Sequence, residues 1–160
     1  MLNSREISTQ ILSKIYNDCD LEDAINSSQS FLKLGSRDRA FTRLILLNTL
    51  RRHGEIDNVI GMFLKKPLKK KDYFIQNLLR ISVAQILFLD TPEYSAVNSA
   101  VEISKKSGFD KLVNGVLRNI CRKKKSLIKN LNPNTNLPEW IKRDIKKNFG
   151  EKILSKISQK

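Results

Sequence analysis

The sequence has few of the residues that build catalytic centres, metal sites and crosslinked folds. Its 160 residues include one histidine, two cysteines, one tryptophan, six glycines and four prolines. Cys19 and Cys121 lie far apart and in no metal-ligand spacing, so we expect two reduced thiols. The glycines form no loop of the Walker or dinucleotide-binding type. His53 stands beside a glycine at an expected helix end, where a histidine usually interacts with the helix dipole instead of acting as a base.

Long hydrophobic runs and clustered catalytic groups are missing as well. No apolar run reaches the ~18 residues of a transmembrane helix, and the N-terminal MLNSREIST is too polar for a signal peptide. The one cluster of carboxylates, within residues 18–23, is more typical of a solvated turn than of a metal site. Because no nucleophile, base and orienting group come together, the sequence predicts a cytoplasmic binding module that is neither membrane-bound nor itself an enzyme.

Positive charge is the dominant feature of the composition. The chain carries 30 lysines and arginines against 16 aspartates and glutamates, a formal net charge of +14. Such an excess usually serves nucleic acid, an anionic membrane surface or an acidic partner. A lysine-rich solvated surface is the simpler alternative. The arginines favour a polyanion, because a guanidinium group can hold a phosphate through two hydrogen bonds.

Apolar residues recur at helical spacing nearly throughout, and no stretch alternates with period two. The sequence therefore predicts an all-α bundle of about seven helices with a short C-terminal helical extension. The segment DYFIQNLLRISVAQILFL is apolar enough to form the central helix. Residues 96–121 have the pattern of two amphipathic helices around a turn at Ser107 and Gly108.

The strongest helical pattern is SRDRAFTRLILLNTLRR, at residues 36–52. Its apolar positions predict one face turned toward the core, with the arginines on the other side or at the ends. The residues expected on the inward face are Ala40, Phe41, Leu44, Ile45, Leu47 and Leu50.

Three groups of basic residues are candidates for contact with phosphates. They are Arg37, Arg39 and Arg43; Lys69, Lys70 and Lys71; and Arg118, Arg122, Lys123 and Lys124. The arginines are the stronger candidates, because a run of lysines is by default a solvated surface. Asp38 could instead pair with an arginine in a purely structural role. Aromatic residues able to stack on bases are few, with Tyr16, Tyr73 and Tyr94 as candidates.

Three segments resemble the NusB fold, an all-helical RNA-binding domain. They are SRDRAFTRLILLNTLRR, KKPLKKKDYFIQNLLRISVAQILFLDTPEYSAVNSAVEISKKSG and KLVNGVLRN, and they follow in this order within residues 1–125. The resemblance implies RNA as the partner. It also implies that Asn98 and Asn114 belong to the shared helical core, with each amide bonded to the backbone or to a side chain.

Two branches of the family compete. One is the free-standing transcription antitermination factor NusB, which binds boxA RNA with a small ribosomal protein. The other is the N-terminal domain of the RsmB/Sun methyltransferases, which make 5-methylcytosine in small-subunit ribosomal RNA with S-adenosylmethionine. Three features favour the second branch: the stretch LLNTLRRHGEIDNVIGMFLKKPLKKKD, Arg118 where free NusB usually carries an acidic residue, and the continuation LPEWIKRDIKKNFG. A helical protein-interaction module, in which the lysines only solubilise, is a further alternative.

The resemblance implies three parts of the chain. Residues 1–125 form the RNA-binding domain, 126–137 a linker rich in asparagine and proline, and 138–160 the start of a connection to a methyltransferase domain that this sequence lacks. S-adenosylmethionine is expected only for that absent domain, and neither cysteine matches the family's catalytic cysteines. The final EKILSKISQK stops in mid-pattern, so we expect a longer parent protein. The expected partner is small-subunit ribosomal RNA, with a ribosomal protein added if the chain is free NusB.

Overall fold

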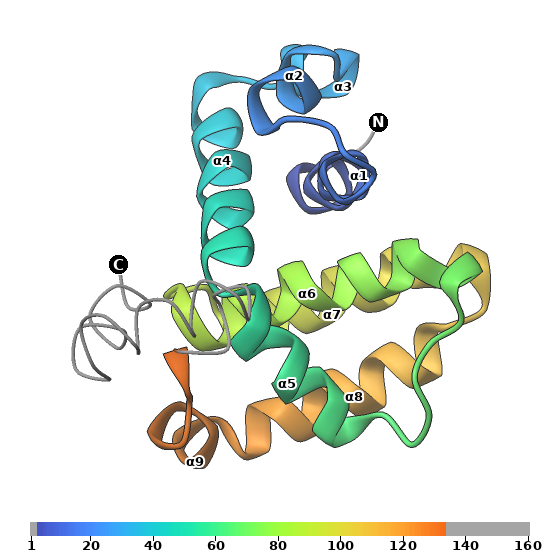
Figure 1. Cartoon of the computed structure of the whole chain (residues 1–160), viewed down its shortest axis with the longest axis vertical. Coiled ribbons are helices and arrows are strands. Elements are labelled where there is room, and N and C mark those ends of the chain that lie inside the picture. Colours follow the sequence, from blue (N-terminus) through green and yellow to red (C-terminus); the bar gives the residue numbers. More distant parts are fainter. Residues whose placement is uncertain (1–2, 134–160) are drawn as a thin grey trace, which may run out of the picture.

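The computed structural model describes residues 3–133, which form a bundle of helices without a strand (Figure 1). The prediction of an all-α fold is confirmed. In this part of the chain the elements are α1 (Ser4–Tyr16), α2 (Leu21–Asn26), α3 (Gln29–Leu32), α4 (Ser36–Arg51), α5 (His53–Phe63), the 3₁₀ turn η1 (Lys70–Asp72), α6 (Tyr73–Phe88), α7 (Glu93–Ser104), the 3₁₀ turn η2 (Lys105–Ser107), α8 (Asp110–Arg122) and α9 (Lys124–Lys129). Helices α2 and α3 are separate because Ser28 Oγ accepts a hydrogen bond from Phe31 N (3.2 Å) and begins α3.

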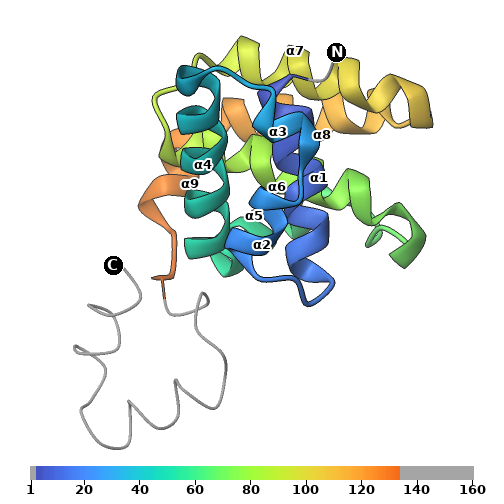
Figure 2. The same ribbon diagram turned by 90° about the horizontal axis from the view of Figure 1, so that it is seen from above.

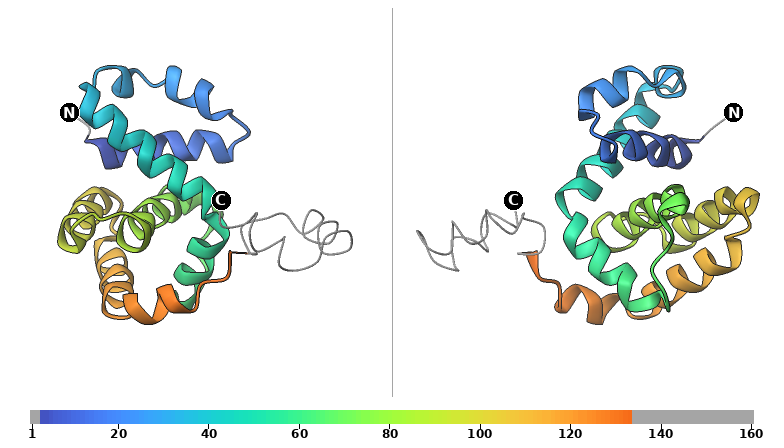
Figure 3. Two further views of the ribbon diagram at one scale, coloured as in Figure 1. Left: turned by 90° about the vertical axis from the view of Figure 1, so that its left-hand side faces the viewer. Right: turned by 45° about the vertical axis from the view of Figure 1, so that its right-hand side comes forward.

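Helix α6 is the centre of the bundle, as its sequence predicted. It packs against α1, α4, α5, α7 and α8, and Figure 3 shows α1–α3 on one side of it and α8 on the other. Two of its buried polar side chains bond to carbonyl groups one turn earlier. Ser82 Oγ donates to Leu78 O (2.7 Å) and Gln85 Nε2 to Ile81 O (2.9 Å). A helix buried along most of its length can hold these residues because their polar atoms have partners.

The inward face of α4 differs from the prediction. Leu44 and Leu47 are 47% and 48% exposed, and Ala40 is exposed too. The Thr42 and Thr49 hydroxyls bond to carbonyl oxygens one turn earlier, at 2.8 and 2.7 Å, so threonine is buried without an unpaired group. Apolar residues occupy two sides of this helix, and only packing decides which side is buried. The buried residues are Thr42, Ile45, Leu46 and Thr49, while Phe41 and Leu50 are half-buried.

Helices α7 and α8 form the hairpin that the sequence predicted, and Figure 2 shows them side by side. Gly108 ends η2 in the left-handed conformation (φ 76°) that glycine adopts readily. The placement of Asn98 in the core was wrong, because Asn98 lies on the exposed side of α7. Asn114 is half-buried, and its Oδ1 accepts a hydrogen bond from Arg118 Nε (3.0 Å). Apart from Ser104, whose hydroxyl donates to Val101 O (2.9 Å), the two helices bury only aliphatic side chains, and Asn98 stands on the other side of α7.

Within residues 3–133, α9 extends to Lys129, into the segment predicted as a linker. Leu127 of α9 is buried and joins the core, so residues 126–129 belong to the packed bundle. The amphipathic segment predicted from residue 138 lies outside the described residues, as does the rest of 134–160. Among residues 3–133, no helix combines the length and apolar character needed to cross a membrane.

Candidate nucleic-acid interface

Two of the three candidate arginines on α4 hold the fold together. Arg39 Nη2 donates to the carbonyl oxygen of Leu32, at the end of α3. Arg43 Nη1 lies 3.2 Å from Glu22 Oε1 of α2. Both guanidinium groups also lie over the Phe31 ring, at 5.8 and 5.5 Å from its centre. Arg39 and Arg43 therefore tie α2 and α3 to α4.

Arg37 differs from these two because its side chain is exposed in the first turn of α4. It shares one stripe of that helix with Ala40, Leu44, Leu47 and Arg51, all of them exposed. The α4 group of candidates is thus one exposed cation and two arginines bonded to neighbouring helices, which the sequence alone did not separate.

The second candidate group lies in the connection between α5 and α6. Lys69, Lys70 and Lys71 are exposed, and the last two belong to the 3₁₀ turn η1. Asp72 in the same turn offsets one of their charges. Lys65 and Lys66 are exposed earlier in the connection. This group is a set of exposed ammonium charges at the N-terminal end of α6.

The third group gives α8 a basic outer face. The helix buries Val113, Val116, Leu117 and Ile120. At the opposite positions, Lys111, Gly115, Arg118 and Arg122 are exposed and recur every three or four residues. At 1.5 Å per residue, Arg118 and Arg122 are about 6 Å apart along the axis, and Lys111 extends the row to about 16 Å. We call these four residues the α8 face.

The arginines of the α8 face are held by amides, not by carboxylates. Arg118 Nε donates to Asn114 Oδ1 (3.0 Å), and Arg122 Nη1 donates to Asn119 Oδ1 (2.9 Å). An amide orients a guanidinium group but leaves its charge uncompensated. By contrast, Lys124 Nζ lies 3.8 Å from Glu93 Oε1 and is partly neutralised. The α8 face can therefore attract an anion, while Lys124 serves the contact between α9 and α7.

Sequence analysis missed two members of the α8 face. Lys111 stands seven residues before Arg118, and helical periodicity could have placed it in the same row. Gly115 lies between them, and a Cβ atom built there meets nothing within 4 Å. Since no side chain rises at this point, a bulky anionic chain can approach the helix backbone closely.

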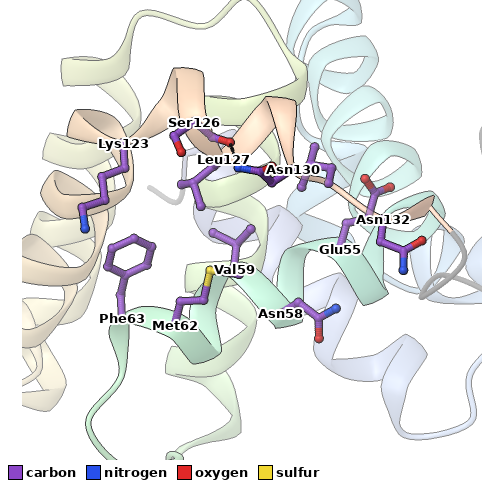
Figure 4. Close-up of a pocket in the computed structure, with 11 residues that line it drawn as sticks. Glu55, Asn58, Val59, Met62, Phe63, Lys123, Ser126, Leu127, Asn130 and Asn132 are labelled. Carbon is purple, nitrogen blue, oxygen red and sulfur yellow. Dashed lines mark hydrogen bonds between the residues drawn. The ribbon is translucent and has the colours of Figure 1, made fainter.

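Lys123 lies at the edge of a hollow of about 330 Å³ between α5 and α9 (Figure 4). Its ammonium group stands 5.9 Å from the centre of the Phe63 ring. The hollow is lined mainly by apolar side chains such as Val59 and Met62, and Glu55 contributes a buried carboxylate. Arg52 Nη1 lies 3.3 Å from Glu55 Oε1, so this carboxylate is paired, and Lys123 stands beside an aromatic ring, apart from the α8 face.

The structure also shows the surroundings of the one histidine and the two cysteines. His53 Nδ1 lies 3.2 Å from Leu50 O in the last turn of α4, close to the helix end where the sequence placed it. Cys19 and Cys121 are free thiols. Burial raises the pKa of the Cys121 thiol, and the neighbouring Glu93 raises it further. No group of three or more histidine, cysteine or acidic residues within 3–133 is arranged to hold a metal ion.

Comparison with known proteins agrees with this architecture. Residues 2–122 match the NusB family. This match covers most of the chain and nearly all of the helical bundle, so the chain belongs to the NusB family, as the three segments of the sequence suggested.

Individual relatives fall into two groups. The chain is 30% identical over 169 residues to the probable ribosomal RNA small subunit methyltransferase B of Bacillus subtilis, covering 96% of this chain and 37% of that protein. It is 30% identical over 125 residues to the transcription antitermination protein NusB of Macrococcus caseolyticus, covering 76% of this chain and 95% of that protein. A third relative, methyltransferase B of Proteus mirabilis, is 26% identical over 93% of this chain and 36% of its own length. The chain thus spans little more than a third of the methyltransferases that it matches.

Proposed function

We propose that this chain is the RNA-binding domain of an rRNA cytosine-5 methyltransferase. It binds small-subunit ribosomal RNA through phosphate contacts and positions it for a catalytic domain outside this chain. The chain itself performs no chemistry, and S-adenosylmethionine would bind the catalytic domain. Similarity to methyltransferases B over nearly the whole chain supports this assignment.

The observation that carries the RNA contact is the uncompensated charge of the α8 face. Arg43, Arg52, Arg80, Lys105 and Lys124 each have a carboxylate within 4.0 Å. Arg118 and Arg122 are instead bonded to asparagine oxygens and remain exposed. A cation that is already paired with a carboxylate has little affinity for another anion. An exposed guanidinium group that an amide holds in position keeps its charge and binds phosphate well. Arg37 and Lys69 to Lys71 are secondary contacts.

The test is binding of the whole chain to fragments of small-subunit ribosomal RNA over a range of salt concentrations. Each neutralised phosphate contributes a slope of about −0.7 (single strand) to −0.9 (duplex) in log K against log salt. Replacing both arginines, Arg118→Gln with Arg122→Gln, should weaken binding about tenfold and reduce the slope by about 1.4–1.8. A slope that stays unchanged in the double variant contradicts the contact.

Lys105→Gln is the matched control. It removes the same unit of charge from an exposed side chain of the neighbouring turn η2, but Lys105 Nζ lies 2.9 Å from Glu102 Oε2. Because that charge is already compensated, the substitution should change affinity less than twofold. The comparison is with the single variants Arg118→Gln and Arg122→Gln, each of which also removes one charge. A loss in Lys105→Gln equal to that in either single variant would indicate that only net charge matters.

A free-standing antitermination factor is the second candidate. The relative from Macrococcus caseolyticus favours it, because this chain covers 95% of that whole protein. Under this alternative the chain binds boxA RNA together with a ribosomal protein. Two measurements separate the candidates: competition between boxA RNA and ribosomal RNA fragments, and the reading frame that follows the codon of Lys160. A continuation into a cofactor-binding sheet supports the methyltransferase, and preference for boxA with no continuation supports the antitermination factor.

A further inference from the structure

A hollow of about 470 Å³ lies where the C-terminal end of α1 meets the N-terminal end of α6. Tyr73 and Phe74 of α6 form one wall. Gln10, Lys14 and Asn17, from α1 and its C-terminal cap, form another. The site therefore combines an aromatic wall with two carboxamides and an ammonium group.

Tyr73 is the residue of this hollow whose exposure is not explained by packing among the described residues. Its side chain is 52% exposed, whereas the neighbouring Phe74 is half-buried against the core. Tyr73 directly follows η1, so its ring is adjacent in sequence to the exposed Lys69, Lys70 and Lys71. An exposed ring beside a basic run is the arrangement with which proteins bind unpaired nucleotides, stacking the base and neutralising its phosphates.

The polar wall fits a base edge. Gln10 and Asn17 are exposed, and each carboxamide can both donate and accept hydrogen bonds. Lys14 Nζ makes a long contact of 3.5 Å with Ser27 Oγ, which leaves its charge uncompensated. These carboxamides can form hydrogen bonds with the donors and acceptors of a nucleic-acid base. The ammonium group of Lys14 lies close enough to attract the phosphates of the RNA strand that carries this base.

Charge separates this hollow from two others. The hollow between α5 and α9 contains the carboxylate of Glu55, and a third, beside the connection from α5 to α6, contains that of Asp57. None of the described residues that line the hollow at Tyr73 is acidic. Of the three, it is the one whose lining contains a lysine and no carboxylate.

We propose that this hollow binds one unpaired RNA base, stacked on Tyr73, while Lys69 to Lys71 hold the adjacent phosphates. The proposal rests on the proposed function, since it assumes an RNA partner, and it adds a base-binding subsite apart from the α8 face. Stacking on an aromatic ring tolerates any base, so the subsite selects single-stranded RNA over duplex and not one sequence over another.

The test uses the whole chain and a short single-stranded RNA carrying 2-aminopurine, with a duplex of the same length for comparison. Tyr73→Ala should weaken single-strand binding about 5- to 150-fold, which corresponds to the loss of one stacked base. Tyr73→Phe keeps the ring and should bind within about twofold of the parent chain. The fluorescence quenching of 2-aminopurine on binding should be lost in Tyr73→Ala and kept in Tyr73→Phe.

Tyr94→Ala is the matched control, because Tyr94 is 71% exposed on α7 and lines none of the three hollows. It should leave both RNAs bound as before. The salt slope gives an independent signature: Tyr73→Ala removes no charge and should not change it, whereas Lys70→Gln with Lys71→Gln should lower it by about 1.4.

Several results would overturn the subsite. One is a loss in Tyr73→Ala no larger than that in Tyr94→Ala, and another is an equal loss on single strand and duplex. Loss of a protein partner with RNA binding unchanged would assign the hollow to protein docking instead. The proposed function fails separately: a chain that binds no ribosomal RNA refutes both, but dependence on Arg118 and Arg122 with a silent Tyr73→Ala refutes the subsite alone.

Discussion

The Asp57–Arg80 pair joins two helices through two hydrogen bonds and should be costly to break. Arg80 Nε and Nη2 donate to the two carboxylate oxygens of Asp57, at 2.8 and 3.0 Å, and so join α6 to α5. Arg80 Nη1 donates to Asn77 Oδ1 (2.7 Å), and Asn77 Nδ2 donates to Ser13 Oγ of α1 (2.9 Å). The guanidinium group also lies 4.8 Å from the centre of the Tyr16 ring. One arginine thus connects three helices.

The magnitude follows from the burial of the pair. The side chains of Arg80 and Asp57 are 21% and 39% exposed, between the surface and the interior. Exposed pairs contribute about 0.2–1 kcal/mol, and removing one partner of a buried pair costs about 3–5 kcal/mol. Asp57→Ala should therefore lower the free energy of unfolding by about 2 kcal/mol. For a domain of this size that corresponds to a fall in Tm of about 6–8 °C.

The assay is urea unfolding followed by circular dichroism, with thermal melts in parallel. A double-mutant cycle with Arg80→Met should give a coupling energy of about 1–2 kcal/mol, since the two hydrogen bonds are lost together. Glu22→Ala is the control, because its partner Arg43 is 43% exposed and Glu22 itself 58%. It should cost less than about 0.5 kcal/mol. If Asp57→Ala costs no more than Glu22→Ala, the reasoning from burial and bidentate geometry is wrong.

Three further outcomes are expected. Gly108→Ala places a side chain on a backbone of positive φ and should lower the free energy of unfolding by about 1 kcal/mol. Gly115→Ala lies in open space on a helix, so it should be neutral or stabilising by up to about 1 kcal/mol. Equal effects of the two substitutions in chemical unfolding would contradict the assigned backbone conformation. Burial raises the pKa of the Tyr16 phenol, so the neutral phenol favours the folded state, and the stability present below about pH 10 is lost as the pH rises through the folded-state pKa. Tyr16→Phe should therefore flatten the loss of stability at alkaline pH. An unaltered pH profile in this variant would contradict the role of Tyr16. Glu93→Gln removes a charge that raises the pKa of Cys121, so alkylation of the Cys121 thiol near pH 8, followed by mass spectrometry of its peptide, should be faster than in the parent chain; a slower reaction would reverse the inferred sign.

The sequence indicated the structure well where a residue interacts with the backbone of its own segment. Asn3 Oδ1 accepts a hydrogen bond from Glu6 N (2.9 Å) and caps α1, a local interaction of the kind that sequence spacing indicates. Gly108 ends the turn before α8 for the same kind of reason. The apolar length of α6 predicted its central place, because a helix that is apolar on most sides must be covered on most sides.

Signals that depend on a distant partner were not visible in the sequence. The arginines of α4 looked alike, yet Arg39 and Arg43 are bound by Leu32 and Glu22 while Arg37 is exposed. Arg118 and Lys124 likewise carry the same charge, but an asparagine holds the first and a glutamate the second. Whether a cation can bind an anion depends on its neighbours in space, and these come from other helices or other turns.

The sequence by itself determined the helical class and the excess of positive charge, which depend on composition and on the periodicity of short segments. Its three matching segments indicated the NusB family. Only the tertiary structure decided which side of α4 is buried, that Asn98 is exposed, and which cations remain uncompensated. The physical reason is that burial and ion pairing are set by contacts between helices, and a helix with apolar or basic residues on two sides leaves that choice to its packing partners.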